Sequence, residues 1–394
     1  MKYQRDPKRI RDALGKKVQF LLGDMACVYG GMLAGCSFFA GYPITPASEV
    51  AEGAARLFPR IGATYIQMED EIGSIAALIG AAWGGAKSMT ATSGPGFSLM
   101  MENYGYAVMT ETPCVIVNVQ RTGPSTGQPT LGAQGDMMQC RWGTHGDIEA
   151  LALAPSTVQE CLDFTIEAFN LSEKYRNPAC VMTDGEVGHL RERIIIPEEQ
   201  DLEIIDRVPA IIDKKKFIPF MNSQTIKNCK IPDFPTFGTG YHTYVTGLTH
   251  NEKGFPATDK QPDHERLVKR ITEKITNDAS KLVMVEKLNL DDADIAFVTY
   301  GATARPAESA MEIGRKNRYK VGVLRLKLVW PFPEKEIVKL AKQVDKIIVP
   351  EMNLGQIVHP VREYAGGNCE VISAPKIGGE MHHPAEIYKY LEGK

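Results

Sequence analysis

The chain has 394 residues, of which 43% are hydrophobic and 24% are charged, and its formal net charge is −3. This length and this balance are typical of a globular protein with two domains. Because there is no excess of Lys and Arg to match a phosphate backbone, nucleic acid is excluded as an expected partner.

The first twenty residues are charged and contain no continuous apolar core, so a secretory signal is not expected. No run approaches the roughly eighteen apolar residues of a membrane span, so no membrane segment is expected either. The eight cysteines are scattered, without a CxxC pair or a His/Cys cluster of zinc spacing, which favours buried free thiols. We therefore expect a cytoplasmic, reduced chain with no metal ligands and no iron–sulfur cluster of its own.

Predicted strands and helices alternate between residues 23 and 190. Helices are expected at 23–35, where Asp24 is a candidate cap, and at 47–58, 69–85, 97–110 and 156–175. Strands are expected at 36–41, 63–68, 88–93, 113–120, 148–154 and 178–184. Strands separated by helices of this length predict βαβ crossovers and a parallel sheet.

Four loops follow predicted strands and should meet at one edge of this sheet. They are GYPITP at 41–46, EDE at 69–71, SGPG at 93–96 and the long segment 121–147. Ligands of such sheets bind outside the carboxyl ends of the strands. Pro43 and Pro46 would stiffen the first loop at the place where a ligand is held, which lowers the entropy cost of binding.

The second half of the chain changes character twice. Residues 191–285 are rich in Pro, Lys and Asp and predict an ordered but irregular connection with one helix at 263–280. From 292 onwards the strand–helix alternation returns and predicts a smaller α/β domain. The predicted divisions are an N-terminal extension (1–22), a first domain (23–200), the connection (201–285) and a second domain (286–394).

Three acids, Glu69, Asp70 and Glu71, open a helix that is apolar almost all round. The helix dipole favours acids in a first turn, so capping alone would explain them. However, a helix of this composition should be buried, and one of the acids should be buried with it. A buried carboxyl group has a raised pKa and can share a proton with a ligand nitrogen.

Arg121 ends an apolar strand and enters a loop rich in Gly, Ser and Thr. This position suits bidentate capture of a carboxylate, although a surface arginine at a strand end is the alternative interpretation. His145 has no nearby Cys or His partner and is interpreted as structural. The SGPG turn is too common to indicate a function by itself, and no GxGxxG or GxxxxGK[ST] pattern occurs.

Taken together, five motifs resemble the α subunit of the 2-oxoacid:ferredoxin oxidoreductase family. The residues of these motifs are most similar to those of the 2-oxoglutarate branch. The five motifs are YPITP (42–46), MEDEIG (68–73), TSGPG (92–96), NVQRTGPSTGQPT (118–130) and GTHGD (143–147). The second domain is also similar to this family, in YGATARPA (300–307), VLRLKLVWPFP (323–333) and PEMNLGQ (350–356). The resemblance extends from about residue 18 to residue 390.

The resemblance implies an α/β fold with a thiamine-diphosphate-binding parallel sheet domain of the pyrimidine type and a smaller transketolase C-terminal-like domain. It implies oxidative decarboxylation of 2-oxoglutarate to succinyl-CoA, with coenzyme A as acceptor and ferredoxin as the electron carrier. A β subunit is expected to hold Mg²⁺ and a 4Fe–4S cluster, and γ and δ subunits are optional further partners. This chain lacks a GDG motif with a downstream Asn, and Asp184-Gly185-Glu186 is the nearest match. Activity is therefore expected only with the β subunit.

Site residues follow from the same resemblance. Glu71 matches the catalytic glutamate, which bonds N1′ of the aminopyrimidine, while Arg121 matches the arginine that binds the substrate's 1-carboxylate and Thr45 a threonine beside the substrate. Small misplacements there are costly, so Pro43 and Pro46 would serve to fix Thr45. The remaining expected contacts are Tyr42, Pro43, Ile44, Gly94 and Pro95 with the cofactor, and Thr126 and Thr130 with the substrate.

Several alternatives stay open at this point. The same chemistry could act on a branched-chain 2-oxoacid, on pyruvate or on an indolepyruvate-like acid, because Arg121 would bind the carboxylate common to all of them. A non-catalytic scaffold is the other class, although Thr45, Glu71 and Arg121 are all present. Arg141 and His145 are candidates for binding the distal carboxylate, as is the β subunit. The sequence does not indicate a coenzyme A site.

Overall fold

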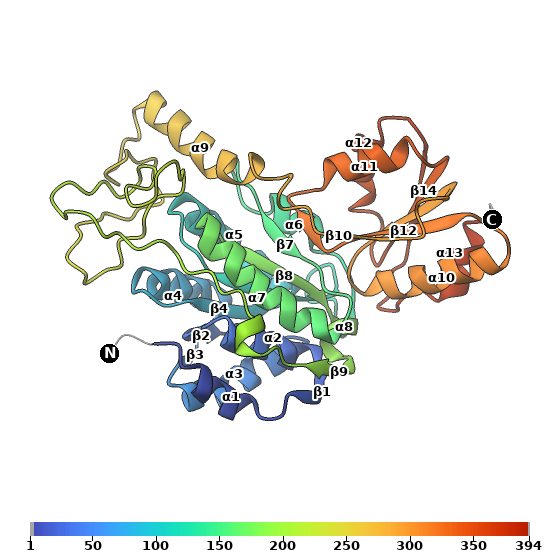
Figure 1. Ribbon diagram of the computed structural model, residues 1–394, viewed down its shortest axis with the longest axis horizontal. Helices are drawn as coiled ribbons and strands as arrows, with labels where there is room; N and C mark the ends of the chain where they lie inside the picture. Colours follow the sequence, from blue (N-terminus) through green and yellow to red (C-terminus); the bar gives the residue numbers. More distant parts are fainter. Residues whose placement is uncertain (1–3, 393–394) are drawn as a thin grey trace.

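A computed structural model describes residues 4–392 and contains two α/β units joined by an irregular connection (Figure 1). The larger sheet has eight strands in the order β13-β7-β8-β5-β4-β2-β3, with β6 paired to β5. Its strands are β2 (Phe38–Gly41), β3 (Thr64–Gln67), β4 (Ser88–Thr92), β5 (Val115–Thr122), β6 (Gln128–Gly132), β7 (Leu151–Leu153), β8 (Ala179–Asp184) and β13 (Leu328–Trp330). The six strands from β7 to β3 run parallel, as predicted, and only β6 and β13 are antiparallel to their neighbours.

Helices cover both faces of this sheet because alternate residues of its apolar strands point to opposite sides. The helices are α2 (Gly23–Leu33), α3 (Ser48–Ile61), α4 (Glu71–Trp83), α5 (Gly94–Met109) and α7 (Val158–Tyr175). One core cluster joins α2, α3 and α7 to strand residues such as Val117, and the other joins α4 and α5 to residues such as Ile116. The SGPG segment is not a separate turn, since α5 already begins at Gly94.

The N-terminal segment packs against the first domain. It forms α1 (Pro7–Leu14) and β1 (Val18–Leu22), and β1 pairs antiparallel with β9 (Arg191–Ile195), which follows the short α8 (Gly185–His189). These elements were not predicted. No described helix is both long and apolar enough to cross a membrane.

The predicted helix cap at Asp24 is wrong. α2 begins at Gly23 with Leu22 in the N-cap position, so Asp24 lies inside the first turn, where it is fully buried. Burial raises the pKa of Asp24 well above its usual range. The physical reason for the error is that α2 is buried along its whole length, so its start is set by packing rather than by a side-chain cap.

The connection between the domains is irregular, as expected, apart from a short 3₁₀ turn (Glu199–Asp201) and α9 (Gln261–Thr276). Its apolar residues reach the core of the first domain, where Phe234 packs on Trp83 with ring centroids 4.6 Å apart. In Figure 1 these loops lie on the left and α9 runs above the sheet towards the second domain.

The second domain holds a five-stranded sheet in the order β10-β12-β11-β14-β15. Its elements are β10 (Val285–Leu288), β11 (Ile295–Thr299), a 3₁₀ turn (Gly301–Thr303), α10 (Ala304–Lys316), β12 (Val321–Leu326), α11 (Glu334–Ala341), β14 (Lys346–Glu351), α12 (Val358–Ala365), β15 (Glu370–Pro375) and α13 (Pro384–Lys389). Only β10 is antiparallel. Because β13 leaves this domain and pairs with β7, one strand of the second half completes the first sheet.

A buried ion cluster attaches α9 to the first domain. Glu111 is fully buried, and its carboxylate lies 2.6 Å from Arg270 Nη2 and 3.2 Å from Lys274 Nζ. Although burial by itself would raise the pKa of Glu111, the charges of Arg270, Lys274 and Arg176 lower it to about 2.

Replacing Glu111 with Gln should lower the free energy of unfolding, measured by urea denaturation, by about 3–5 kcal/mol, because it leaves buried cations unpaired. The folded-state pKa of about 2 lies below the ordinary value, so the carboxylate's contribution is present at neutral pH and is lost as the pH falls towards 2. The difference in the free energy of unfolding between Glu111→Gln and wild type should therefore become smaller as the pH is lowered. The exposed Glu265–Lys269 pair of the same helix supplies the control, and an equal loss in Glu265→Gln would contradict the account.

Candidate active site

The loops predicted to share one sheet edge do share it. β2, β3, β4 and β5 are parallel neighbours, so the segments that follow them begin at the same edge. The loop 42–47 follows β2, residues 68–70 follow β3, and Ser93 follows β4. This edge is where a parallel α/β sheet binds its ligands.

Glu71 is the buried acid of the three that open α4. Asp70 is the N-cap residue and its side chain accepts a hydrogen bond from Gly73 N at 2.7 Å, while Glu69 is exposed. Glu71 is only 4% exposed. Its burial raises its pKa; the Glu71 backbone N–H opposes this rise, Asp70 adds to it, and Arg121 opposes it.

The prediction that α4 is buried all round is wrong for one face. Ile72 is 46% exposed, and Ala76 and Gly80 are exposed beside it on successive turns. This apolar strip lies on the helix that carries Glu71.

Gly96 brings the first turn of α5 against the Glu71 carboxyl group. A Cβ atom at Gly96 would lie 2.3 Å from Glu71 Oε1 and 2.3 Å from Thr92 Oγ1, so no larger residue fits without displacing them. Gly94 and Pro95, the first two residues of α5, are half-buried beside it.

Arg121 links the end of β5 to the loop 42–47. Its Nη1 atom donates a hydrogen bond of 2.7 Å to the carbonyl oxygen of Thr45. Arg121 is 7% exposed, so the alternative interpretation as a surface arginine is wrong. Burial lowers the pKa of Arg121, and the carboxyl groups of Asp136 and Glu71 oppose that shift. The guanidinium group and the two acids therefore share one electrostatic environment.

Asp136 is a buried acid of this site that the sequence analysis missed. Its Oδ2 accepts a hydrogen bond of 2.9 Å from Asn118 Nδ2, and its backbone N–H donates one of 3.0 Å to Gln120 Oε1. Burial raises the pKa of Asp136 to about 6, although Asn118 and Arg121 act in the opposite direction. The sequence signal for a polar site here was the pair of amide side chains, Asn118 and Gln120, in the mostly apolar strand β5.

Hydrogen bonds from the second domain fix the backbone of the first domain directly before Asp136. Gln134 N donates to the carbonyl oxygen of Met352 at 3.1 Å, and Asn353 Nδ2 donates to the carbonyl oxygen of Gln134 at 2.7 Å. Gln356 Nε2 donates to the carbonyl oxygen of Gly135 at 2.5 Å. The motif at 350–356 therefore acts on the site through the backbone just before Asp136.

The Asp184 carboxylate is used in hydrogen bonds that hold the fold together. Asp184 is the N-cap residue of α8, and its carboxylate accepts hydrogen bonds of 3.0 Å from Val187 N, 3.0 Å from Ala302 N and 3.3 Å from Gln134 Nε2. With both oxygens used in this way, Asp184 joins the two domains.

The other predicted site residues lie in more open positions. Tyr42 and Pro43 are exposed, Ile44 is half-buried against the core, and Thr126 and Thr130 lie on the exposed segment from β5 to β6. His145 is exposed, whereas Arg141 contacts the Glu149 carboxylate at 3.0 Å. The structure therefore brings together Thr45, Glu71 and Arg121, and it leaves Thr126, Thr130 and His145 at the surface.

Comparison with known proteins identifies the class. Residues 29–270 match the family described as pyruvate flavodoxin/ferredoxin oxidoreductase, thiamine diphosphate-binding, and residues 293–387 match pyruvate:ferredoxin oxidoreductase core domain II. The chain therefore belongs to the pyruvate flavodoxin/ferredoxin oxidoreductase family. This confirms the resemblance and the fold class predicted from the motifs.

Within this family the chain is similar to named subunits of two enzymes. It is 53% identical to the 2-oxoglutarate synthase subunit KorA of Methanocaldococcus jannaschii, over 96% of this chain and 100% of that protein. It is 36% identical to the ketoisovalerate oxidoreductase subunit VorB of Methanothermobacter thermautotrophicus, over 92% of this chain and 94% of that one.

Solved structures agree with this assignment. The chain matches 2-oxoglutarate:ferredoxin oxidoreductase from Magnetococcus marinus, solved with 2-oxoglutarate, coenzyme A and succinyl-CoA bound, with a TM-score of 0.88 and 34% identity. That match covers 96% of this chain and 65% of the other. A split-gene transketolase matches with a TM-score of 0.50 and 11% identity, which shows a similarity of fold alone.

The residues at the sheet edge fit a thiamine-type aminopyrimidine. Thr92 Oγ1, Ser93 Oγ, Asn118 Oδ1 and Arg121 Nε are buried polar atoms without a hydrogen-bond partner among the described residues. Thr92 lies beside Glu71, and Asn118 bonds Asp136, so polar groups that need partners surround the two buried acids. Buried polar groups normally have hydrogen-bond partners, which a polar heterocycle would supply.

Replacing Glu71 with Gln should leave the fold intact and lower the turnover rate, assayed with the expected partner subunit, by on the order of 10² to 10⁴. Gln keeps the volume but can neither gain nor lose the proton. Glu69→Gln is the matched control, because Glu69 is exposed two residues earlier. If Glu69→Gln were the inactive variant and Glu71→Gln kept full activity, the assignment of the acid would be wrong.

Proposed function

We propose that this chain is the α subunit of a thiamine-diphosphate-dependent 2-oxoglutarate:ferredoxin oxidoreductase, which forms succinyl-CoA and reduces ferredoxin. The observation that carries the proposal is the buried Glu71 carboxyl group beside Gly96, at the same edge as the Arg121–Thr45 hydrogen bond. The names of the similar KorA subunits support 2-oxoglutarate as the substrate.

Glu71, Arg121 and Thr45 would each have a separate role in the reaction. Thiamine diphosphate, when bound, supplies the carbon nucleophile that attacks the keto group. Glu71, with its raised pKa, would hold or release a proton at the aminopyrimidine N1′. Arg121 would bind the 1-carboxylate of the substrate through the guanidinium atoms not bonded to Thr45. Thr45, fixed by that bond, would orient the substrate.

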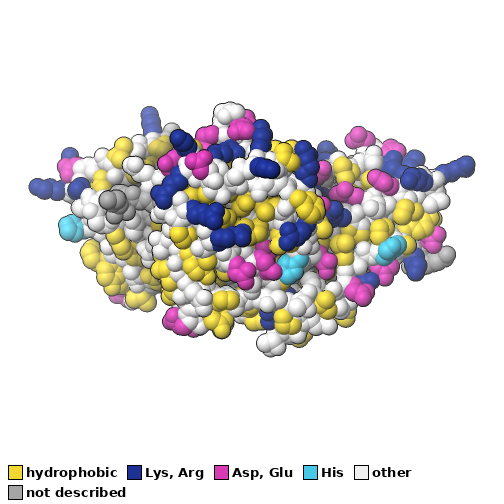
Figure 2. Space-filling view, turned by 90° about the horizontal axis from the view of Figure 1, so that it is seen from below, with side chains coloured by type: hydrophobic (Ala, Val, Ile, Leu, Met, Phe, Trp, Pro, Cys, Tyr) yellow, Lys and Arg dark blue, Asp and Glu magenta, His cyan; other side chains and the backbone are white. Residues whose placement is uncertain are grey.

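A β subunit would complete the site and would hold the diphosphate, Mg²⁺ and the iron–sulfur cluster. Large apolar side chains stand exposed around the candidate site, in Tyr42 (41%), Ile66 (41%), Ile72 (46%) and Leu99 (48%), and would be covered by such a partner. Figure 2 shows that apolar side chains are also visible between charged ones on the face seen from below Figure 1. Ferredoxin, coenzyme A and any γ or δ subunit would act through the assembled complex.

A branched-chain 2-oxoacid is the second candidate substrate, because the chain is also similar to the ketoisovalerate subunit VorB. The identity to KorA, 53% against 36%, favours 2-oxoglutarate. Arg141 is a weaker candidate for binding the distal carboxylate, since its guanidinium group already contacts Glu149.

The test of this function is an assay of the α–β complex with thiamine diphosphate, coenzyme A and oxidised ferredoxin. We expect 2-oxoglutarate to be used best, ahead of 2-oxoisovalerate and pyruvate, and the isolated chain to show no turnover. Equal turnover by the isolated chain would refute the proposal that a β subunit completes the site. A preference for 2-oxoisovalerate would select the second candidate substrate.

Replacing Arg121 with Lys should raise the Michaelis constant for every 2-oxoacid by a similar factor, because lysine cannot form the guanidinium's two parallel hydrogen bonds. The order of substrate preference should stay unchanged, since the 1-carboxylate is common to all of these acids. Arg362→Lys, at an exposed arginine of α12 in the second domain, is the matched comparison away from the candidate site. If Arg121→Lys abolished the use of 2-oxoglutarate alone, Arg121 would bind the distal carboxylate and the substrate would be oriented the other way.

A further inference from the structure

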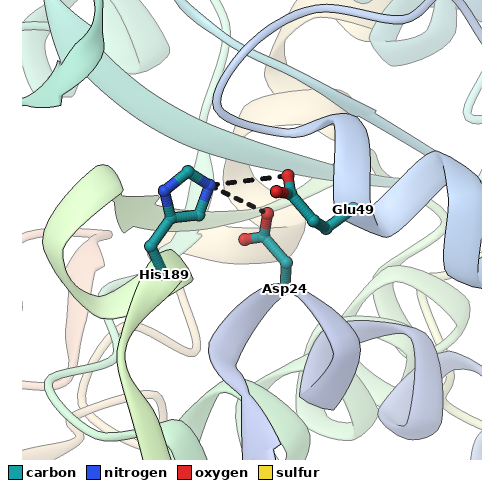
Figure 3. Close-up of side chains that lie close together, drawn as sticks. All are labelled: Asp24, Glu49 and His189. Atoms are coloured by element: carbon teal, nitrogen blue, oxygen red, sulfur yellow. Dashed lines mark ion pairs between the residues drawn. The ribbon is translucent and has the colours of Figure 1, made fainter.

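Three side chains from different helices meet beneath the loop 42–47. Asp24 comes from α2, Glu49 from α3 and His189 from the end of α8, and Figure 3 shows them pointing towards one another. His189 Nε2 lies 3.5 Å from Glu49 Oε2 and 4.0 Å from Asp24 Oδ2. The three potential ligand atoms all lie within 4.8 Å of one another.

Asp24 supplies an independent indication that this cluster binds a cation. It is fully buried, and neither of its carboxylate oxygens has a hydrogen-bond partner among the described residues. Gly188 allows this close packing, because a Cβ atom there would lie 2.6 Å from Asp24 Oδ1. An ionised carboxylate that is buried without hydrogen bonds is costly unless a proton or a cation compensates its charge. Asp24 Oδ2 is the atom that faces His189.

A backbone oxygen extends the set of donors. The carbonyl oxygen of Pro46 lies 3.1 Å from His189 Nε2. Zinc-type ions bind N and O atoms at about 2.0–2.2 Å, which places donor atoms roughly 3–4.4 Å apart around one ion. The distances of 3.1, 3.5 and 4.0 Å from Nε2 fall in this range, so an ion could replace the proton between the imidazole and its oxygen partners.

We propose that Asp24, Glu49, His189 and the Pro46 carbonyl form a binding site for one divalent metal ion of the Zn²⁺ or Mn²⁺ class. An imidazole combined with oxygen ligands favours these ions over Ca²⁺ and Mg²⁺, which take oxygen ligands alone. The side chains of Glu49 and His189 are each 38% exposed, which leaves an entry path and room for water ligands. The sequence predicted no metal ligands because these residues lie far apart along the chain.

The site would act on the loop 42–47. Pro46 directly follows Thr45, whose carbonyl oxygen is bonded to Arg121 on the other side. A bound ion would therefore attach this loop to α2, α3 and α8, while Arg121 attaches it to β5. This positioning role is separate from the proposed chemistry and does not depend on the identity of the substrate.

The site is tested with the full chain, stripped with a chelator and studied without thiamine diphosphate. Isothermal titration with Zn²⁺ and with Mn²⁺ should give about one site per chain, and Mg²⁺ and Ca²⁺ should bind much more weakly. Glu49→Gln and His189→Gln, both at partly exposed positions, should each weaken binding by at least about 100-fold, because each removes an atom that would bind the ion directly. Circular dichroism would show that both variants are folded.

His242→Gln is the matched control, because His242 is exposed in the irregular connection. It should bind the metal as wild type does. The proposal is overturned if wild type binds neither ion, if the Glu49 and His189 variants bind as tightly as wild type, or if Mg²⁺ and Ca²⁺ bind equally well. Asp24→Asn adds a third ligand variant, but the outcome is decided by the two partly exposed ones.

Discussion

The hydrogen bond from Arg121 to the carbonyl oxygen of Thr45 is the contact on which the candidate site depends. It joins the end of the central strand β5 to the loop that follows β2, across β4, which lies between them. The same guanidinium group carries the positive charge that acts on both buried acids, Glu71 and Asp136. Without that charge, two carboxyl groups would be buried at one sheet edge with less to stabilise their ionised forms.

The second domain supports this arrangement from outside. Its strand β13 completes the first sheet, and its segment 350–356 bonds the backbone at Gln134 and Gly135, directly before Asp136. Asp184 adds a further link, because its carboxylate accepts hydrogen bonds from both domains. The smaller domain therefore contributes to the position of the site, although the acids and the arginine all come from the first domain.

The sequence alone predicted the parallel sheet, the shared loop edge and the burial of one acid at the start of α4, because period and composition act locally. It misplaced the cap at Asp24, since the start of α2 is set by packing against distant elements. It missed β1, β9 and β13, which are short strands paired with partners far along the chain. It also missed Asp136, whose environment is assembled from Asn118, Gln120 and the second domain. Glu71, Thr45 and Arg121 were predicted as site residues from the motifs, whereas their positions relative to one another could be seen only in the fold.

The most direct measurement is an experimental structure of this chain with its β subunit and thiamine diphosphate bound. We expect a Glu71 carboxylate oxygen within hydrogen-bond distance, about 2.6–3.2 Å, of N1′ of the aminopyrimidine, with Gly96 beside them. We also expect the diphosphate and its metal ion to be held by the β subunit. An aminopyrimidine bonded to Asp136 or Asp184 instead, with Glu71 turned away from it, would contradict the account.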